Sequence, residues 1–205
     1  MSNPYKDHWE NVYNTKKENE VSWYQNTPQK SIDLIKSINL DLESNIIDVG
    51  AGDSRLVDNL ISLGFKNITV LDISSKSIEK AKIRLGEKSE LINWVVSDIN
   101  DFQSDATYDL WHDRAAFHFL KSTEKIKSYI NLVNKLINNK GNLIGATFSK
   151  KGPSKCSGLE ISQYDSKGIS ELFENFKLNH SEIYIHKTPF NTNPEFIYNI
   201  LSKTN

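Results

Sequence analysis

The chain has 205 residues, with 25 lysines and arginines against 26 aspartates and glutamates, and its pI is about 6.5. This length suits one α/β domain with a sizeable core and is too short for two domains. Because the chain is nearly neutral, it has no net positive charge to attract the phosphates of nucleic acid, and a nucleic-acid substrate is disfavoured. We expect no signal peptide, because residues 1–14 are polar and charged. No 18 apolar residues run together, and the single cysteine fits a reducing compartment. We therefore expect a cytoplasmic protein with no membrane association.

Aromatic residues gather in the first 40 positions, ahead of the first expected strand. They include His8, Trp9, Tyr13, Trp23 and Tyr24. Trp9 and Tyr13 are four residues apart and therefore share one face of a helix. This face either packs on a sheet as an ordinary amphipathic helix or covers a bound cation, to which aromatic rings offer cation–π attraction. A second helix is expected over Pro28 to Ile38.

The segment from residue 45 to residue 72 has the pattern strand, tight turn, helix, strand. Asn45 to Val49 is short, apolar and β-branched, which predicts a strand buried on both faces. A Gly-Ala-Gly turn follows, and its glycines permit positive φ and close approach of a ligand to the backbone. Helical spacing of apolar residues predicts a helix over Ser54 to Leu63, and Lys66 to Leu71 forms the next strand. Asp72 ends that strand, where a carboxylate can accept hydrogen bonds from both ribose hydroxyls of a nucleotide cofactor.

The turn favours S-adenosylmethionine over a nicotinamide cofactor. A dinucleotide fold needs a third glycine, three residues after the second, beneath the pyrophosphate, and Arg55 occupies that position. A sulfonium cofactor has no pyrophosphate and needs that glycine less. From about residue 5 to residue 203 the chain resembles the class I S-adenosylmethionine-dependent methyltransferases. The resemblance implies that Asp72 binds the ribose and that the methionine moiety is held by Asp48, Gly50, Ala51 and Gly52.

The resemblance also implies the contacts of the adenine and of the sulfonium. The acidic residue that this family carries after its third strand matches Asp98. By analogy, the Asp98 side chain binds the adenine amino group and the Ile99 backbone contacts the ring. Ile73, next to the ribose ligand, belongs to the same site. Tyr13 and Trp23 are expected to cover the sulfonium of S-adenosylmethionine, which leaves as S-adenosylhomocysteine.

Strands and helices alternate through the rest of the chain, which implies a mostly parallel sheet with helices on both faces. Helices are expected over Ser75 to Leu85, from Ser122 to Asn138 with Gly141 ending it, and over Asp165 to Phe176. Strands are expected over Leu91 to Val96, from Tyr108 to Trp111, and over Asn142 to Phe148, Glu182 to His186 and Phe196 to Leu201. The resemblance adds an antiparallel last strand. The expected fold is thus an α/β, doubly wound, seven-stranded, mostly parallel sheet of the Rossmann-like methyltransferase type.

We expect one domain over residues 1–205. Residues 1–40 form a helical cover, residues 41–150 the cofactor-binding core, and residues 151–205 a substrate-side loop, a helix and the closing strands. The loop from Ser149 to Gly158 follows the fifth strand and is a candidate lid. Cys156 in this loop is expected to be a surface thiol without a catalytic role. No cluster of side chains has metal-ligand spacing.

The segment after the fourth strand, Trp111 to His118, is where this class of enzymes differs by substrate. It lacks the Asn-Pro-Pro-Tyr sequence of enzymes that methylate amide or nucleobase nitrogens. Its Trp-x-Asp-Arg-Ala sequence resembles a stretch of thiopurine S-methyltransferases. The resemblance implies that Arg114 faces the cofactor and the substrate. Alternatively, Arg114 forms a salt bridge with Asp113 or with a neighbouring helix. Asp113 is the candidate base for an amine acceptor. His118 is either a base or, more in keeping with its apolar surroundings, a core histidine.

These features predict methyl transfer to a small acceptor. Alignment and desolvation can supply most of the acceleration, and a thiol is already partly ionised at neutral pH, so sulfur is the favoured acceptor atom. The amino-terminal aromatics also resemble those of elongation-factor lysine methyltransferases, which leaves a protein lysine as the alternative acceptor. Two further hypotheses are a cofactor-binding module without catalysis and a nicotinamide dehydrogenase.

Overall fold

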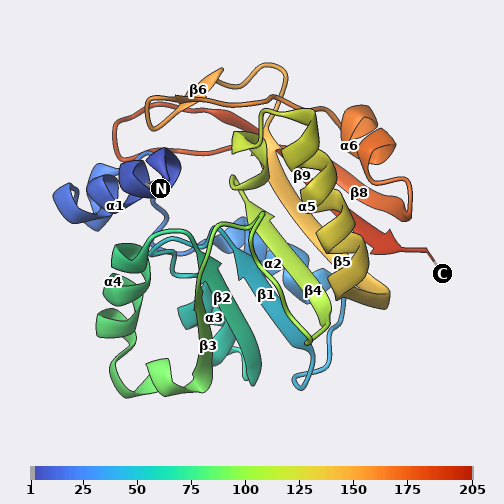
Figure 1. Ribbon diagram of the computed structural model, residues 1–205, viewed down its shortest axis with the longest axis horizontal. Helices are drawn as coiled ribbons and strands as arrows, with labels where there is room; N and C mark the ends of the chain where they lie inside the picture. The colour runs from blue at the N-terminus through green and yellow to red at the C-terminus, as the bar shows by residue number, and fades with distance from the viewer. Residues whose placement is uncertain (1–2, 205) are drawn as a thin grey trace.

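The computed structural model describes residues 3–204, which form an α/β fold around one seven-stranded sheet (Figure 1). The strand order is β3-β2-β1-β4-β5-β9-β8. The strands are β1 (Asn45–Val49), β2 (Asn67–Asp72), β3 (Ile92–Val96), β4 (Tyr108–Arg114), β5 (Ile137–Phe148), β8 (Phe176–Ile185) and β9 (Glu195–Lys203). Strands β3, β2, β1, β4 and β5 pair in parallel, whereas β9 is antiparallel to both β5 and β8. The predicted fold class, including the antiparallel last strand, is confirmed.

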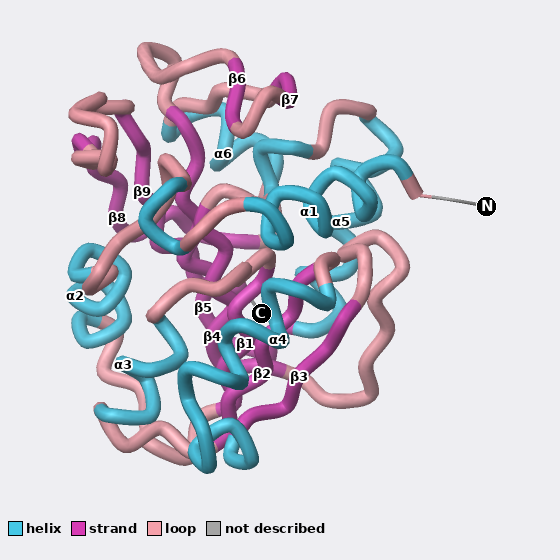
Figure 2. Tube along the Cα trace, turned by 90° about the vertical axis from the view of Figure 1, so that its left-hand side faces the viewer, coloured by secondary structure: helices cyan, strands magenta, loops and turns pink. Residues whose placement is uncertain are grey.

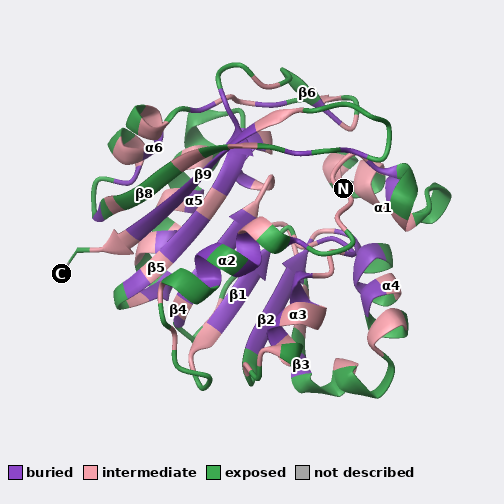
Figure 3. Ribbon diagram, turned by 180° about the vertical axis from the view of Figure 1, so that it is seen from behind, coloured by how far each residue is buried: buried purple, intermediate pink, exposed green. Residues whose placement is uncertain are grey.

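Helices cover both faces of the sheet. The helices are α1 (Pro4–Thr15), α2 (Gln29–Ser37), α3 (Leu56–Ser62), α4 (Ser75–Leu85), α5 (Thr123–Leu136) and α6 (Ser166–Leu172), with short 3-10 turns η1 (Glu18–Glu20), η2 (Gly86–Leu91) and η3 (Phe117–Phe119). Figure 1 shows α5 in front of β4 and β5, and Figure 3, from behind, shows α2 and α3 over the other face. Because side chains alternate along a strand, Ile46 joins the core beneath α2 and α3, while Ile47 joins the core beneath α5.

Two predicted helix ends are wrong. Helix α5 ends at Leu136 and β5 begins at the next residue, so Gly141 lies inside β5 and does not end the helix. Lys140 takes the positive φ there, and a Cβ on Gly141 would lie 3.1 Å from the carbonyl of Tyr108. A Cβ there would lie even closer to Cγ2 of Ile137, at 2.7 Å, and to the carbonyl oxygen of Asn138, at 2.9 Å, so glycine is needed by the backbone of β5 itself as well as by its approach to β4.

The other corrected boundary lies between α6 and β8. Helix α6 ends at Leu172, and Phe176, expected to be its last residue, opens β8. Phe173 and Phe176 are both buried and three residues apart, which is a helical spacing, but they belong to a turn in which the Phe176 N–H donates to the Phe173 carbonyl at 2.9 Å.

Strand order reverses between β1 and β4, and ligands of such sheets bind beyond the carboxyl ends of the strands at this point. Helix α1 lies above this edge because its Glu10 carboxylate accepts hydrogen bonds from the N–H groups of Ser75 and Lys76, at the start of α4, at 2.8 and 3.0 Å. The hairpin of β6 (Lys155–Cys156) and β7 (Leu159–Glu160) lies at the same end of the molecule as α1 (Figure 2). Within residues 3–204, no helix is both long enough and apolar enough to cross a membrane.

Candidate active site

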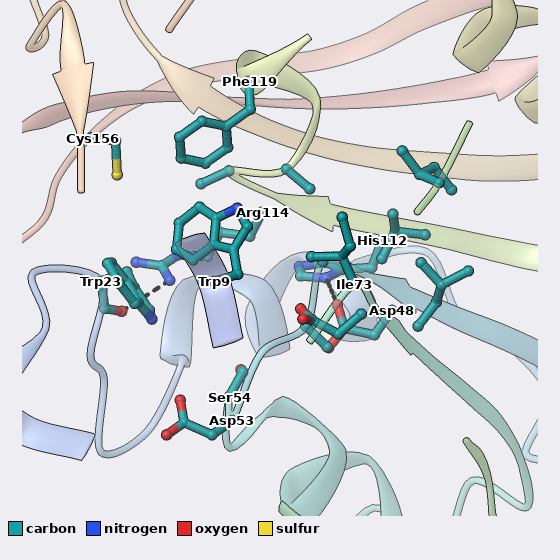
Figure 4. A pocket seen from close by; sticks show the side chains of 18 of the residues that line it. Trp9, Trp23, Asp48, Asp53, Ser54, Ile73, His112, Arg114, Phe119 and Cys156 are labelled. Carbon is teal, nitrogen blue, oxygen red and sulfur yellow. Dashed lines mark hydrogen bonds and ion pairs between the residues drawn. The ribbon is translucent and has the colours of Figure 1, made fainter. Parts of the chain in front are cut away.

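A cavity of about 370 Å³ opens at the carboxyl ends of β1, β2 and β4. This size is in the range of small-molecule and cofactor sites. Figure 4 shows two groups of side chains around it. Trp9, Trp23, Arg114, Phe119 and Cys156 lie on one side, and Asp48 with His112 on the other. We call the first group the acceptor chamber.

The floor of the cavity is the turn after β1, which presents bare backbone. Gly50 and Gly52 have φ of +62° and +60°, a left-handed conformation that side chains other than glycine rarely adopt. A Cβ on Gly50 would collide with Ala116, and one on Gly52 with the hydroxyl of Tyr13. The positive φ predicted for the glycine turn fits this geometry. Gly50 and Ala51 border the cavity, whereas Gly52 is buried beneath the Tyr13 hydroxyl.

Asp72 lies at the end of β2, is 5% exposed and borders the cavity. Its carboxylate accepts hydrogen bonds from the N–H groups of Gly52 at 2.7 Å and Ser74 at 2.8 Å. Burial nevertheless raises the pKa of Asp72 to about 6, since desolvation of the charge outweighs these two bonds. The two hydrogen bonds therefore do not fully offset the cost of burying the negative charge of Asp72. Hydrogen-bond donors from a ligand would offset more of that cost.

The far end of the cavity is bordered by Ile73, Asp98 and Ile99. One carboxylate oxygen of Asp98 accepts from the backbone N–H of Asn100 at 3.0 Å, and the other accepts from the side chain of Asn3 at 3.3 Å. The structure thus brings all the predicted adenosine contacts to one cavity.

Asp48 belongs to a buried chain of three polar side chains that the sequence analysis missed. Its carboxylate lies 2.7 Å from Nδ1 of His112, and Nε2 of His112 lies 2.9 Å from the hydroxyl of Ser31 on α2. All three residues are at most 3% exposed and border the cavity. The parallel register of β1 and β4 pairs Asp48 with His112. This register is the feature from which the Asp48–His112 contact could have been predicted. It can be assigned from the sequence only if the first residue of β4 is known.

The aromatic residues of the amino-terminal segment form walls of the acceptor chamber. The ring of Trp9 packs edge to face against Trp23, with centroids 5.7 Å apart, and against Phe119 at 5.2 Å. Tyr13 is 6% exposed and packs edge to face against Trp23 at 6.3 Å. The shared face of Trp9 and Tyr13 therefore borders the cavity and is not only a packing surface against the sheet.

Arg114 reaches the acceptor chamber from the end of β4. Its Nε donates to the hydroxyl of Tyr198 at 3.2 Å, and its Nη1 donates to the carbonyl of Trp23 at 3.1 Å. Its guanidinium lies 5.4 Å from the ring centre of Phe196. The alternative of a salt bridge to Asp113 or to a helix is not realised among the described residues.

Cys156 also borders this chamber. The expectation of a surface thiol is wrong, because Cys156 is 9% exposed and belongs to the β6–β7 hairpin. Burial raises the pKa of its thiol to about 11, so the group is protonated at neutral pH.

The structure does not bring the candidate bases Asp113 and His118 to the cavity. The Asp113 carboxylate accepts from the backbone N–H groups of Ala116 and Phe117 and, at 2.6 Å, from the hydroxyl of Tyr129, which is a structural capping role. His118 is fully buried, its Nδ1 accepts from the N–H of Phe148 at 3.4 Å, and burial lowers its pKa to about 3. Both predicted catalytic roles are therefore corrected to structural ones.

No metal centre accompanies the cavity in the part of the chain that the structure describes, since no three His, Cys, Asp or Glu side chains there could share an ion.

Comparison with known proteins relates these features to a family. A model described as a methyltransferase domain matches residues 40–198. The ubiquinone biosynthesis O-methyltransferase of Rickettsia bellii is 26% identical over 156 residues, which are 75% of this chain and 63% of that protein. The chain thus spans less than two thirds of the length of this relative.

Solved structures share the fold. One, described as the conversion of a disulfide bond into a thioacetal group during echinomycin biosynthesis, superposes with a TM-score of 0.79 at 14% identity, covering 97% of this chain and 93% of that one. The N-methyltransferase NodS from Bradyrhizobium japonicum, in complex with S-adenosylhomocysteine, has a TM-score of 0.71 at 15% identity and covers 97% of this chain and 100% of that one.

Proposed function

Since the chain belongs to the methyltransferase domain family, whose model matches residues 40–198, we propose that it transfers a methyl group from S-adenosylmethionine to a small nucleophilic acceptor. The observation that carries this proposal is the cavity itself. A bare glycine turn and a buried, under-compensated carboxylate lie at one end, and an aromatic chamber with a cation lies at the other.

The residues around the cavity fit the cofactor from end to end. Asp72 accepts from the ribose hydroxyls, and the Asp98 side chain with the Ile99 backbone binds the adenine, beside Ile73. The backbone of Gly50, Ala51 and Gly52 lies against the methionine moiety, and the carboxylate of Asp48 accepts from its amino group. Tyr13 and Trp23 cover the sulfonium, to which their rings offer cation–π attraction. The support for this assignment is that all of these residues except Gly52 border one cavity, and the N–H of Gly52 donates to the Asp72 carboxylate at 2.7 Å.

The chemistry needs little from the protein beyond alignment. The bound cofactor supplies a methyl carbon activated by positive sulfur. The walls made by Trp9, Trp23 and Phe119 exclude water and hold the nucleophile in line, which can be worth about 7–11 kcal/mol in an oriented reaction. Asp113 and His118 lie outside the cavity, so no predicted base can take a proton from the acceptor.

The absence of such a base from the acceptor chamber supports an acceptor that ionises by itself. A thiol near pKa 8.5 is a few per cent thiolate at neutral pH, whereas a lysine near pKa 10.4 would need a carboxylate or desolvation to lose its proton. A thiol or a similarly acidic small molecule is therefore our favoured acceptor. The ubiquinone O-methyltransferase and the N-methyltransferase NodS act on oxygen and nitrogen by name, so the comparisons do not select the acceptor atom.

Calorimetry with S-adenosylhomocysteine tests the cofactor assignment, and NADH serves as the competing ligand. We expect saturable binding of S-adenosylhomocysteine, lost in Asp72→Ala. Preferential binding of NADH would contradict the proposal. Release of S-adenosylhomocysteine is then screened with thiols, amines and carboxylates as acceptors. Labelled methyl groups found only in protein after incubation with cell extract would favour a protein lysine as the acceptor, and binding without turnover of any acceptor would favour a module without catalysis.

A further inference from the structure

Arg114 differs from the other two arginines of the chain in its partners. Arg55 pairs with Glu18, and Arg84 pairs with Asp58. Arg114 instead donates only to the neutral oxygens of Tyr198 and Trp23, and among residues 3–204 no carboxylate lies within ion-pairing distance of it. Its remaining terminal nitrogen, Nη2, is buried without a hydrogen-bond partner there. A buried donor of a charged group that lacks an acceptor is unfavourable and needs an explanation.

The titratable groups that face Arg114 do not compensate its charge. They are His118, His186 and Cys156, and the guanidinium charge affects the pKa of each. Burial lowers the pKa of His118 to about 3 and that of His186 to about 4, and it raises the pKa of Cys156 to about 11. All three are therefore neutral at pH 7. The guanidinium is an isolated positive charge among neutral groups, whereas Lys121 and Lys125, which also border the cavity, are exposed at its rim.

The surroundings of this charge are flat and apolar. Trp9, Trp23 and Phe119 pack edge to face around the chamber, and Phe196 lies beneath the guanidinium. Aromatic walls favour a planar, apolar body, and a guanidinium with a free N–H favours a carboxylate or a similar anion over a neutral group.

We infer that the acceptor is a small planar molecule that carries an anionic group, bound by the unpaired guanidinium of Arg114 at the border of the cavity, in addition to the nucleophile that takes the methyl group. This inference rests on the proposed function and assigns the substrate class of the same site. With an aromatic thiol carboxylate, the thiol loses its proton to water. The thiolate lone pair then forms the new bond from sulfur to the methyl carbon, and the electron pair of the broken carbon–sulfonium bond stays on the cofactor sulfur, giving S-adenosylhomocysteine. The carboxylate is unchanged throughout.

Two probes of the same shape separate charge from fit. 4-Mercaptobenzoate and its neutral amide, 4-mercaptobenzamide, differ only in the group offered to Arg114. The native protein should methylate the carboxylate with a kcat/KM about 10- to 100-fold higher, since a hydrogen bond to a charged group is worth about 1.5–3 kcal/mol. In Arg114→Gln the ratio should fall to about one, while Lys121→Gln, which removes an exposed cation from the rim, should keep the native ratio. Equal rates for both probes in the native protein, or an unchanged ratio in Arg114→Gln, would overturn the inference.

A second measurement separates this inference from the proposed function. If no acceptor is turned over, quenching of tryptophan fluorescence by benzoate and by benzamide is compared in the complex with S-adenosylhomocysteine. Selective binding of benzoate that Arg114→Gln abolishes and Lys121→Gln keeps would support the anion site although methyl transfer had failed. Equal binding of the two probes would reject the anion site whatever the protein does with its cofactor. Arg114→Lys, which keeps the charge but loses the planar fork, should retain only part of the preference.

Discussion

The pKa of Asp72 predicts that cofactor affinity depends on pH. In the proposed site, ribose hydroxyls donate to the ionised carboxylate. Binding should therefore favour the ionised form, and affinity should be lost as the pH falls through the pKa of the free protein. With a pKa of about 6, roughly one molecule in eleven has an ionised Asp72 at pH 5 and nearly all do at pH 7.5. S-adenosylhomocysteine should therefore bind about tenfold more weakly at pH 5.

The stability of the unliganded protein should move in the opposite direction. Burial raises the pKa of Asp72 from 3.8 to about 6, so between these pH values the folded state binds more protons than the unfolded chain. The contribution of Asp72 to the free energy of unfolding therefore falls as the pH rises through this range, by about 3 kcal/mol in total.

Titration calorimetry from pH 5 to pH 8, in buffers with different ionisation enthalpies, measures both the affinity and the protons released. Two neighbouring titratable groups, Tyr13 and Asp53, could add a pH dependence of their own to the binding of S-adenosylhomocysteine. Tyr13 stays neutral because its pKa is raised well above 10, but Asp53 also has a raised pKa from burial. Asp72→Asn should bind weakly and without this pH dependence, and the matched variant Asp53→Asn should keep it. A flat native profile would refute the reasoning, and loss of the dependence in Asp53→Asn alone would assign the ribose contact to Asp53.

Three further predictions concern other residues in and around the cavity. His112→Phe should weaken binding of S-adenosylhomocysteine but not of 5′-methylthioadenosine, which lacks the amino acid, while Ser31→Ala should bind both normally by calorimetry; equal losses for the two ligands would make His112 merely structural. Gly52→Ala should abolish detectable binding and lower the melting temperature, because its Cβ collides with the Tyr13 hydroxyl, and Tyr13→Phe should restore part of the stability. His118→Asn should change kcat by no more than about twofold, since loss of a general base costs about 10²–10⁴-fold.

The cofactor half of the cavity could be predicted because its signals are local in the sequence. The strand that ends at Val49, the glycine turn and Asp72 lie within 28 consecutive residues, and each signal has one physical cause: apolar β-branched residues for the buried strand, positive φ for the turn, and a carboxylate at a strand end. The boundaries at Leu136 and Phe176 could not be predicted, because apolar spacing that fits a helix continued into segments that tertiary packing holds as a strand or a turn.

The error at Asp113 comes from the length of β4. The strand was expected to end near Trp111, but it continues to Arg114. Side chains alternate between the two faces of a strand, so His112 and Arg114 both face the cavity and Asp113 points toward α5, where Tyr129 binds it. Had the strand been extended by three residues, the alternation would have predicted both the importance of His112 and the structural role of Asp113.

No local sequence pattern predicts the acceptor chamber, because its walls come from segments that are far apart in the sequence. They are α1, the segment before α2, the end of β4, η3 and the β6–β7 hairpin. One contact nevertheless couples it to the cofactor half. Ser74 donates its N–H to the Asp72 carboxylate and its hydroxyl to the carboxylate of Glu10, both at 2.8 Å, and Glu10 lies next to Trp9 on α1. The turn that positions the Asp72 carboxylate therefore also anchors the helix that forms an aromatic wall.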